Sequence, residues 1–510
     1  MQKITRGVAA LAACAAAAAA LSACGGSGEG GGSSDSLTVA TMTLPQSLDP
    51  KDAAGSAMPF FQAAYDTLVK REPDGTYSPM LATKWEYNGD RTELTLTLRG
   101  DVKFDDGTPF DGAAVKANME RFAAGGGGMA KTLADVEEIE VTDATHVVLH
   151  LKQPNPAMLF YLSDAAGLMA NPAKFDDAGD PLKTKPDGTG PYDLDSGRTA
   201  IGTKWVYTAD TGYWGTELPY KQLTFQYFDN ETAIVNGLKT GQVNAAVLQT
   251  ANAQARIEKD PGVETRKQEF DFQGILLFDR GGKITPALAE PKVRQALNHA
   301  IDRPTMLAKI QQGRGEATSQ VFGTESVAYQ EELDSYYSYD PAKAKRLLKE
   351  AGYADGFDLK LPRISAIVPD ALAASLQTYF KAIGVELTWD DMDQSAVRRI
   401  FTDREYSGMV MNMGQSANDW VAIGELVLPG TFNFFGTTDA TVRELLPRIG
   451  AVQPEQAEAQ LHELNRHLVE EAWFVPFYRL SYLHVSDGGV TIEPQSGMAL
   501  PSIYNYAPAG

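Results

Sequence analysis

The 510-residue chain has very few cysteines and histidines. It contains two cysteines, Cys14 and Cys24, and six histidines. Both cysteines precede residue 25, so everything after that point must fold without a disulfide bond. Stability must therefore come from burial of apolar surface, and a chain of this length has ample material for that. Six histidines without an apparent cluster also leave few ligands for a metal site.

The sequence also lacks the motifs that commonly identify hydrolases. It has no G-x-S-x-G elbow, no H-E-x-x-H pair and no G-x-x-x-x-G-K-[ST] loop. His462 and His467 are five residues apart, which turns their rings about 140° from each other on a helix. His146 and His150 would lie about 13 Å apart along a strand. We therefore expect no enzyme, no bound metal and no cofactor, with a secreted hydrolase as the alternative from another class.

Positive charge is scarce relative to negative charge. Lysine and arginine together number 45 and aspartate and glutamate 66, for a formal net charge of −21. Such a balance disfavours nucleic acids and anionic lipid surfaces as partners. No stretch beyond residue 36 is apolar for 18 residues in a row, so no later membrane span is expected.

The chain begins like an exported protein. A basic start and an alanine-rich apolar run are typical of a secretory signal peptide, whereas a membrane anchor would need about 20 predominantly apolar residues. Leu21-Ser22-Ala23-Cys24 resembles the lipobox of bacterial lipoproteins, whose cysteine receives diacylglycerol. The resemblance implies a signal peptide over 1–23, a lipid on Cys24, and a place on the outer face of the cytoplasmic membrane. Residues 24–36, rich in glycine and serine, would be the tether. An ordinary signal peptide is the alternative.

The rest of the chain mixes strand and helix patterns. β-Branched residues alternate or cluster in four predicted strands: 36–42, 92–99, 145–152 and 385–391. Apolar residues at helical spacing, ended by glycine, predict helices over 341–353 and 369–384. Helices that alternate with strands favour α/β lobes, and a body of this length is expected to hold two or three domains.

Several stretches resemble the peptide- and nickel-binding branch of the bacterial extracellular solute-binding proteins of family 5. KFDDGTPF, followed at this distance by VRQALNHAIDR, is the most specific combination. The stretches follow the family's order over almost the whole chain beyond the tether: SLDP (47–50), AYDTLV (64–69), PMLATKWE (79–86), LTLTLRGDVKFDDGTPFDGAAVKANMERF (94–122), GTGPY (188–192), VRQALNHAIDRPTML (293–307), YDPAKAKRLLKEAGY (339–353) and VPFYRL (475–480).

These signatures are expected to mark folding. Asp111 can cap the helix that follows it. His299 is expected to be packed or exposed, and not a ligand. Five apolar residues share one helical face and are predicted to be core: Val293, Ala296, Leu297, Ala300 and Ile301.

The resemblance implies an α/β fold of the type II periplasmic-binding-protein class, with two lobes joined by a hinge. Lobe I would have a core made of 37–53, 189–271 and 486–510, together with an extra subdomain over 54–188. Lobe II would comprise 272–485. The implied function is that of a monomeric receptor that encloses a short peptide between its lobes and passes it unchanged to an ABC permease and ATPase complex.

A peptide has two charged ends, which a closed cleft must pair. In dipeptide-binding relatives an arginine holds the carboxylate, and Arg363 matches that position, with a solvated surface arginine as the alternative. Within 409–420 such relatives present an aspartate to the amino end. A simple count places Asn418 there, and a slip of one residue places Asp419 there.

That departure leaves blocked peptides, oligosaccharides and other uncharged solutes open, with a nickel chelate as a weaker alternative. An adhesive or structural lipoprotein that binds no solute is a third class. Aromatic residues of 270–274 are expected near the hinge, and Trp420 could equally be core. The remaining predicted binding residues are Gln415 and Trp420 of the same segment, and Thr41, Met42 and Thr43 after the first strand.

Overall fold

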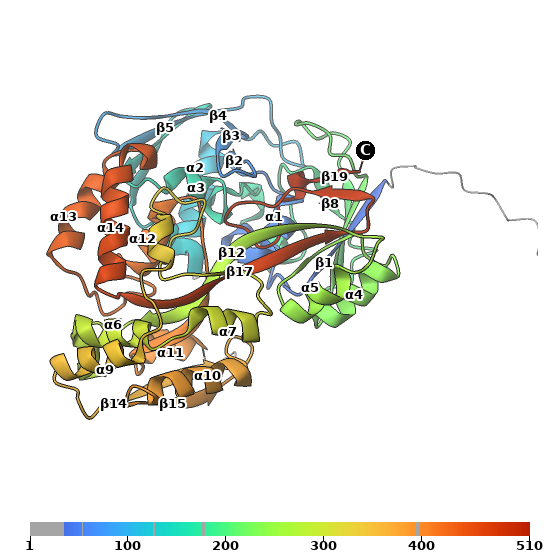
Figure 1. Cartoon of the computed structure of the whole chain (residues 1–510). Coiled ribbons are helices and arrows are strands. Elements are labelled where there is room, and N and C mark those ends of the chain that lie inside the picture. The colour runs from blue at the N-terminus through green and yellow to red at the C-terminus, as the bar shows by residue number, and fades with distance from the viewer. Residues whose placement is uncertain (1–34, 54, 126–127, 176–178, 394–396, 510) are drawn as a thin grey trace, which may run out of the picture.

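The computed structural model describes residues 35–53, 55–125, 128–175, 179–393 and 397–509 (Figure 1). The predicted signal peptide, Cys24 and the tether up to residue 34 lie outside the described residues. Within the described part, no helix combines the length and apolar character that crossing a bilayer would require.

Among the described residues, nine strands form one sheet through the middle of the molecule. Their order is β16-β12-β17-β11-β1-β10-β9-β8, and β13 pairs with β17. Strand β1 is parallel to β10 and β11, and the other pairs are antiparallel. The bounds are β1 Ser36–Thr41, β8 Tyr192–Leu194, β9 Lys204–Ala209, β10 Gln222–Tyr227, β11 Ala245–Leu248, β12 Glu264–Leu277, β13 Glu316–Ala317, β16 Gly408–Gly414 and β17 Phe474–Ser486.

Strands β12 and β17 are the longest in this sheet and cross the molecule side by side (Figure 1). At one end β17 pairs with β11, which lies within the predicted lobe I. Near the other end β12 pairs with β16, which lies within the predicted lobe II. These two strands therefore connect the lobes, and the predicted boundary at 271/272 falls inside β12. The domain boundaries themselves stay a prediction.

The extra subdomain contains a second, antiparallel sheet of order β4-β5-β7-β6. Helix α2 (Gly112–Ala124) contacts β6 and β7, and Asp111 caps it by accepting a hydrogen bond from the Ala114 amide at 3.0 Å. The strands are β4 Ala82–Tyr87, β5 Glu93–Leu98, β6 Val136–Asp143 and β7 His146–Leu151. The predicted strands at 36–42, 92–99 and 145–152 and the predicted cap are thus confirmed.

Lobe II is built from helices around β14 (Phe357–Ile364) and β15 (Val385–Met392), which are parallel. The helices at 341–353 and 369–384 and the strand at 385–391 are confirmed. All five residues of the predicted core face around 293–301 are fully buried. His299 is also buried, its Nδ1 lies 2.8 Å from the Ser338 carbonyl oxygen, and burial lowers its pKa. The helices here are α6 Pro291–His299, α7 Arg303–Ile310, α9 Pro341–Glu350 and α10 Asp370–Lys381.

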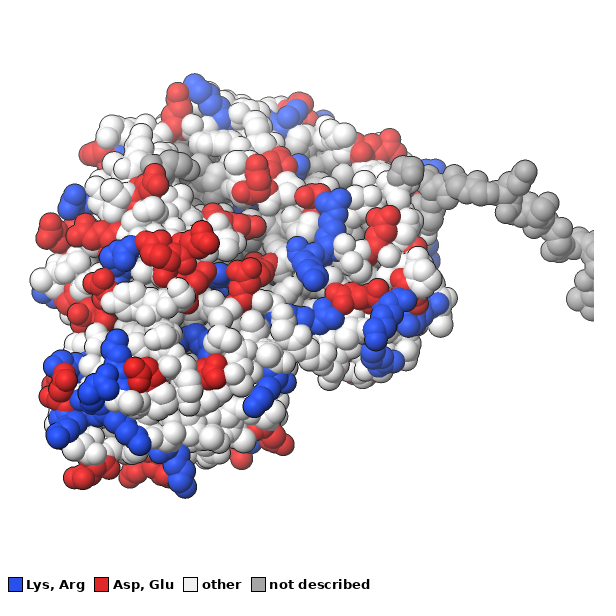
Figure 2. All heavy atoms as spheres, in the orientation of Figure 1, with Lys and Arg blue, Asp and Glu red and all other residues white. Residues whose placement is uncertain are grey.

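Basic side chains gather over α6 and α9, at the lower left of Figure 2. The structure has further α-helices and strands besides these. They are α1 Met58–Gln62, α3 Met158–Leu162, α4 Glu231–Lys239, α5 Ala251–Ile257, α8 Glu331–Asp334, α11 Val397–Asp403, α12 Asp419–Leu426, α13 Ala440–Gly450, α14 Glu458–Glu470, β2 Val69–Arg71, β3 Tyr77–Pro79, β18 Val490–Ile492 and β19 Tyr506–Pro508.

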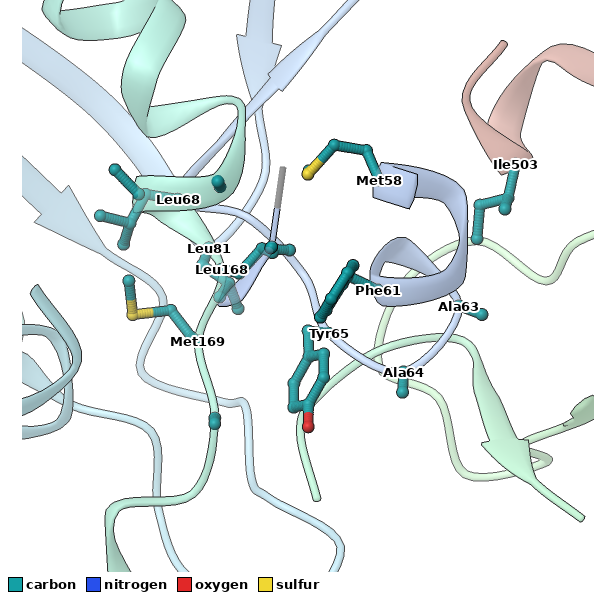
Figure 3. Packing of buried hydrophobic residues seen from close by; sticks show 14 of the residues in the cluster. Met58, Phe61, Ala63, Ala64, Tyr65, Leu68, Leu81, Leu168, Met169 and Ile503 are labelled. Atoms are coloured by element: carbon teal, nitrogen blue, oxygen red, sulfur yellow. The ribbon is translucent and has the colours of Figure 1, made fainter. Parts of the chain in front are cut away.

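A large apolar core holds the extra subdomain to the rest of lobe I. Figure 3 shows part of it around Phe61 and Tyr65, and the Tyr65 hydroxyl donates to the Leu48 carbonyl at 3.0 Å. The segment 188–192 packs directly on this region. A Cβ on Gly188 would lie 2.2 Å from the Ala64 oxygen, and one on Gly190 would lie 2.4 Å from the Ala64 carbonyl carbon. Only glycine permits this approach.

Candidate functional site

A cavity of about 430 Å³ lies between lobe II and the extra subdomain, and we call it the interlobe cavity. Its lobe I wall includes Arg71, Tyr87 and Phe160, and its lobe II wall includes Glu325 and the loop 416–418. Its volume is within the range of small-molecule sites. Segments far apart in the sequence therefore enclose one space.

The two walls touch each other beside the cavity. The Asn418 Nδ2 donates to the Pro156 carbonyl at 3.4 Å. Gly75 has a φ of +86°, and a Cβ there would lie 3.3 Å from the Cβ of Ala417. The loop before α12 thus packs directly on the turn between β2 and β3 and on the chain that leads into α3. Separation of the lobes would break these contacts.

The lobe I wall of the cavity is rich in hydrogen-bond donors. Arg71 ends β2, is buried, and stacks its guanidinium 4.2 Å from the ring centre of Phe160. Its Nη2 lies 3.3 Å from Asp164 Oδ2, whereas its Nε and Nη1 have no hydrogen-bond partner among the described residues.

The guanidinium of Arg91 stacks 4.2 Å from the ring centre of Tyr87. Among the described residues, the Arg91 Nε and the Tyr87 hydroxyl also lack a hydrogen-bond partner. Burial raises the pKa of Tyr87 to about 12, so its hydroxyl stays protonated and can donate.

The predicted binding segment 415–420 divides at the start of α12. Asn418 caps this helix, since its Oδ1 accepts from the Trp420 amide at 3.1 Å, and it lines the interlobe cavity. Asp419 is 1% exposed and is not part of the cavity wall. Its Oδ1 accepts from the Ser326 hydroxyl and from the Ala328 amide at 3.1 Å, and burial raises its pKa. The geometry therefore brings Asn418 to the cavity and Asp419 into the interior of lobe II.

Gln415 and Trp420 lie on the interior side of the same segment. Gln415 is buried and its Nε2 donates to the Val321 carbonyl at 2.9 Å. Trp420 belongs to an apolar cluster with Ile423 and Ile449. Neither is among the residues that line the interlobe cavity.

Arg363 lies on β14, away from the interlobe cavity. Its Nε donates to the Val368 carbonyl at 2.9 Å, its Nη1 lies 3.3 Å from Asp391 Oδ1, and its Nη2 pairs with Asp370. The side chains of Asp370 and Asp391 are 96% and 76% exposed, so both carboxylates are well solvated and hold the guanidinium from the solvent side. A ligand carboxylate would have to compete with them.

The remaining predicted residues lie at the end of β1 and in the middle of β12. Thr41 is buried and its Oγ1 accepts from the Thr43 amide at 2.9 Å, while Met42 is exposed. In the segment 270–274, Phe272 is packed in the core of lobe II. Asp271 accepts a hydrogen bond from the Tyr482 hydroxyl at 2.5 Å, and burial raises its pKa to about 6. These groups are not part of the interlobe cavity wall.

A second cavity of about 420 Å³ lies within lobe I and is acidic. Asp105, Asp193 and Asp210 line it together with Trp214. Burial, with repulsion from neighbouring aspartates, raises the pKa of Asp105 to about 7. Even so, the described residues contain no group of three histidine, cysteine or acidic side chains arranged to hold a metal ion.

No sequence pattern distinguishes Arg71, Tyr87 or Arg91 as functional residues. Arg71 follows the strand-like segment 66–70 and precedes a turn, as many surface arginines do. Arg71 packs against Phe160 and Asp164, which lie far away in the sequence, and it shares the cavity wall with the loop 416–418. The signal exists only in three dimensions.

Known proteins resemble this chain along most of its length. Glutathione-binding proteins GsiB of Escherichia coli O1:K1 and of Shigella dysenteriae serotype 1 are each 31% identical over 319 residues, which cover 62% of this chain and 61% of those relatives. The aligned part is thus less than two thirds of the relatives' own length.

Solved structures show the same fold. AgaA from A. tumefaciens R10, in complex with agropinic acid, has a TM-score of 0.79 at 24% identity and covers 93% of this chain and 99% of its own. DppA from Helicobacter pylori, in complex with the peptide STSA, has a TM-score of 0.79 at 21% identity over 93% and 98%. NikA from Brucella suis, in complex with Fe(III)-EDTA, has a TM-score of 0.77 at 23% identity over 93% and 99%. The fold is therefore that of the periplasmic binding proteins.

The sequence profile described as bacterial extracellular solute-binding proteins, family 5 Middle, matches residues 76–428, which is more than half of the chain. This match agrees with the order of short signatures along the sequence and with the two-lobed structure. The chain belongs to the family 5 bacterial extracellular solute-binding proteins.

Proposed function

We propose that the protein is the solute receptor of an ABC importer, exported and anchored to the outer face of the membrane by a lipid on Cys24. It binds a short peptide between its lobes and passes it unchanged to the permease and ATPase complex. The observation that carries this proposal is the interlobe cavity, whose walls come from both lobes. A solute that contacts both walls favours the closed arrangement over the open one.

A peptide suits the chemistry of the cavity. Arg71 and Arg91 supply positive charge, Asn418 supplies a neutral amide, and Trp85 and Phe160 supply apolar surface. Glutathione and the peptide STSA, named for the similar proteins, are both peptides. The family resemblance predicts Arg363 as the carboxylate partner, but this residue is not part of the cavity wall and already pairs with Asp370 and Asp391. Asn418 is favoured over Asp419 at the amino end, since it alone of the two lines the cavity.

An oligosaccharide or another uncharged solute is the second candidate. The observation that favours it is Asn418 at the position where peptide-binding relatives have an aspartate, because an amide leaves a free ammonium group without an ion pair. Trp85 and Tyr87 in the cavity wall would stack on sugar rings.

Recovery of the bound solute tests the proposal directly. The exported protein is purified without added ligand and denatured, and the released small molecules are identified by mass spectrometry. A short peptide, rebound intact by the refolded protein, is the expected result. Release of chemically altered product above a no-protein control would instead indicate a hydrolase. If no peptide, oligosaccharide or metal chelate raises the unfolding temperature, the receptor assignment fails and a structural lipoprotein replaces it.

A further inference from the structure

Arg71 differs from other buried arginines of this protein in how few hydrogen bonds it makes. Arg303 is also buried, and its three guanidinium nitrogens donate to four backbone carbonyls and one side-chain oxygen. Arg71 is 7% exposed, yet among the described residues only its Nη2 has a partner, Asp164, at 3.3 Å. The Asp164 Oδ1 is already engaged, because it accepts from the Ala165 amide at 2.7 Å.

A buried guanidinium with two unpaired nitrogens is costly. A buried donor without an acceptor opposes folding, and a charged one does so more strongly. Folded proteins rarely retain such groups unless water or a ligand satisfies them. The position of Arg71 against a cavity of about 430 Å³ leaves room for a ligand group of many atoms.

The neighbours of Arg71 point to an acceptor of negative charge. Tyr87 and Arg91 line the same cavity and also carry unpartnered donors within the described residues. The two acids of the cavity wall, Asp74 and Glu325, are exposed and therefore belong to its rim. Positive charge and free donors thus lie on the buried Arg71 and the half-buried Tyr87 and Arg91, whereas negative charge lies on exposed residues. This arrangement disfavours a cation inside the cavity.

We infer that the interlobe cavity is a carboxylate-binding site, in which the Arg71 guanidinium and the Tyr87 hydroxyl donate to a carboxylate group of the solute. A carboxylate offers about four acceptor positions and matches the planar fork of a guanidinium. This inference rests on the proposed receptor function and adds the chemical class of the solute. It also makes Arg71, and not Arg363, the partner of that carboxylate, because Arg363 lies outside the cavity and already has two carboxylates of its own.

The site would also couple binding to closure. A carboxylate held by Arg71 lies against the extra subdomain, and the rest of the solute then faces Ser416 and Asn418 of lobe II. Only the closed arrangement supplies both walls. An anionic group at Arg71 is therefore expected to favour closure, whereas an amide in its place loses much of that effect.

The test uses the full-length protein in detergent and a set of di- and tripeptides, each as free acid and as C-terminal amide, together with glutarate. Dissociation constants are measured by calorimetry. Wild-type protein is expected to bind free acids more tightly than amides. Arg71→Met should weaken the acids about 30-fold or more and leave the amides nearly unchanged. Tyr87→Phe should weaken the acids about 10-fold.

Two variants serve as controls. Arg99→Met removes an arginine of the same subdomain that also stacks on an aromatic ring, Trp214, and pairs with one aspartate, but lies outside the interlobe cavity. It should bind acids and amides as the wild type does. Arg363→Met tests the rival position. If it removes the difference between acid and amide and Arg71→Met does not, the inference is overturned.

Two further outcomes are also decisive. If Arg71→Met does not fold, Tyr87→Phe decides, because the Tyr87 hydroxyl has no partner among the described residues and its loss should not destabilise the protein. If no peptide binds in either form, the proposed peptide function fails and glutarate decides the inference alone. A rise in unfolding temperature with glutarate that Arg71→Met abolishes supports the carboxylate site, and no rise in the wild type overturns it.

Discussion

Arg479 lies in β17, in the connection between the lobes, and its replacement by methionine should destabilise the protein strongly. Its side chain is fully buried. Nη1 and Nη2 donate to the two oxygens of Asp334 at 2.9 and 2.6 Å. Nη2 also lies 3.2 Å from Glu316 and Nε lies 3.2 Å from Glu269. One cation thus joins β17 to β12, β13 and α8.

Removal of this cation would leave three carboxylates without a positive partner among the described residues. Loss of one partner of a buried ion pair costs about 3–5 kcal/mol. The lower end applies here, because Asp334 keeps hydrogen bonds from Thr318 and Gln320, at 2.7 and 2.8 Å, and Glu316 is well exposed. We therefore expect Arg479→Met to lower the free energy of unfolding by about 3 kcal/mol at neutral pH.

The pH dependence gives the sharper result. Burial opposes ionisation of Asp334, but hydrogen bonds from Arg479 and from its neutral partners prevail and hold its pKa below the ordinary value. A carboxyl group with a lowered folded-state pKa stabilises the protein above its unfolded pKa, about 3.9, and this contribution is lost as the pH falls through the folded value. The difference between wild type and variant should therefore shrink as the pH falls below about 4.

Urea denaturation at pH 7 and at low pH measures this difference. The control is Arg314→Met, which removes an arginine that pairs with one partly exposed carboxylate, Glu258, and also donates to Gln254 at 3.2 Å. This change should cost about 1 kcal/mol or less. A difference for Arg479→Met that is below 1 kcal/mol at pH 7, or that stays constant into the acid range, would refute the argument that the charge of Arg479 stabilises the connection.

Three further predictions concern the anchor, the binding segment and the packing of a family signature. Cys24→Ala should move the protein from the detergent phase to the aqueous phase in a partition assay, and unchanged partition would contradict the lipid anchor. Asn418→Asp should raise the preference for free-amine over N-acetylated peptides about 10-fold in calorimetry. Asp419→Asn, at a buried position outside the cavity, should leave this preference unchanged. The reverse result would restore Asp419 as the amine partner. Gly190→Ala should lower the free energy of unfolding by about 1–3 kcal/mol in urea denaturation, because its Cβ would clash with the Ala64 carbonyl. Gly202→Ala is the control: its Cβ would meet nothing within 4 Å, so this change adds backbone strain without a clash.

Much of the fold follows from local sequence patterns because its elements are determined locally. Alternating β-branched residues specify the strands at 92–99 and 145–152, and Asp111 caps α2 as its position predicts. The buried face around 293–301 follows from helical spacing. The short length of β11, and its place between β1 and β17, depend on pairings across more than 200 residues and leave no local signal.

In the binding segment, the position along the sequence does not determine which residue faces the cavity. Asn418 and Asp419 are neighbours with similar side chains, and a shift of one residue exchanges their predicted roles. The start of α12 separates them in space: the cap residue stays outside the helix and faces the cavity, while the first helical residue turns inward to Ser326 and Ala328. The helix boundary, which patterns locate only within a few residues, therefore decides which of the two side chains a solute can reach.

A related argument separates Arg363 from Arg71. Sequence patterns report which residues are charged, but not whether the protein already satisfies them. Arg363 has two solvated carboxylates and a carbonyl as partners, so its guanidinium is already stabilised when no ligand is bound. Arg71 is desolvated and has two nitrogens without a partner among the described residues. A bound carboxylate would accept hydrogen bonds from these nitrogens and so offset the desolvation penalty of the guanidinium. An unsatisfied buried donor in a cavity is therefore a stronger indication of a binding residue than a charge at a family position.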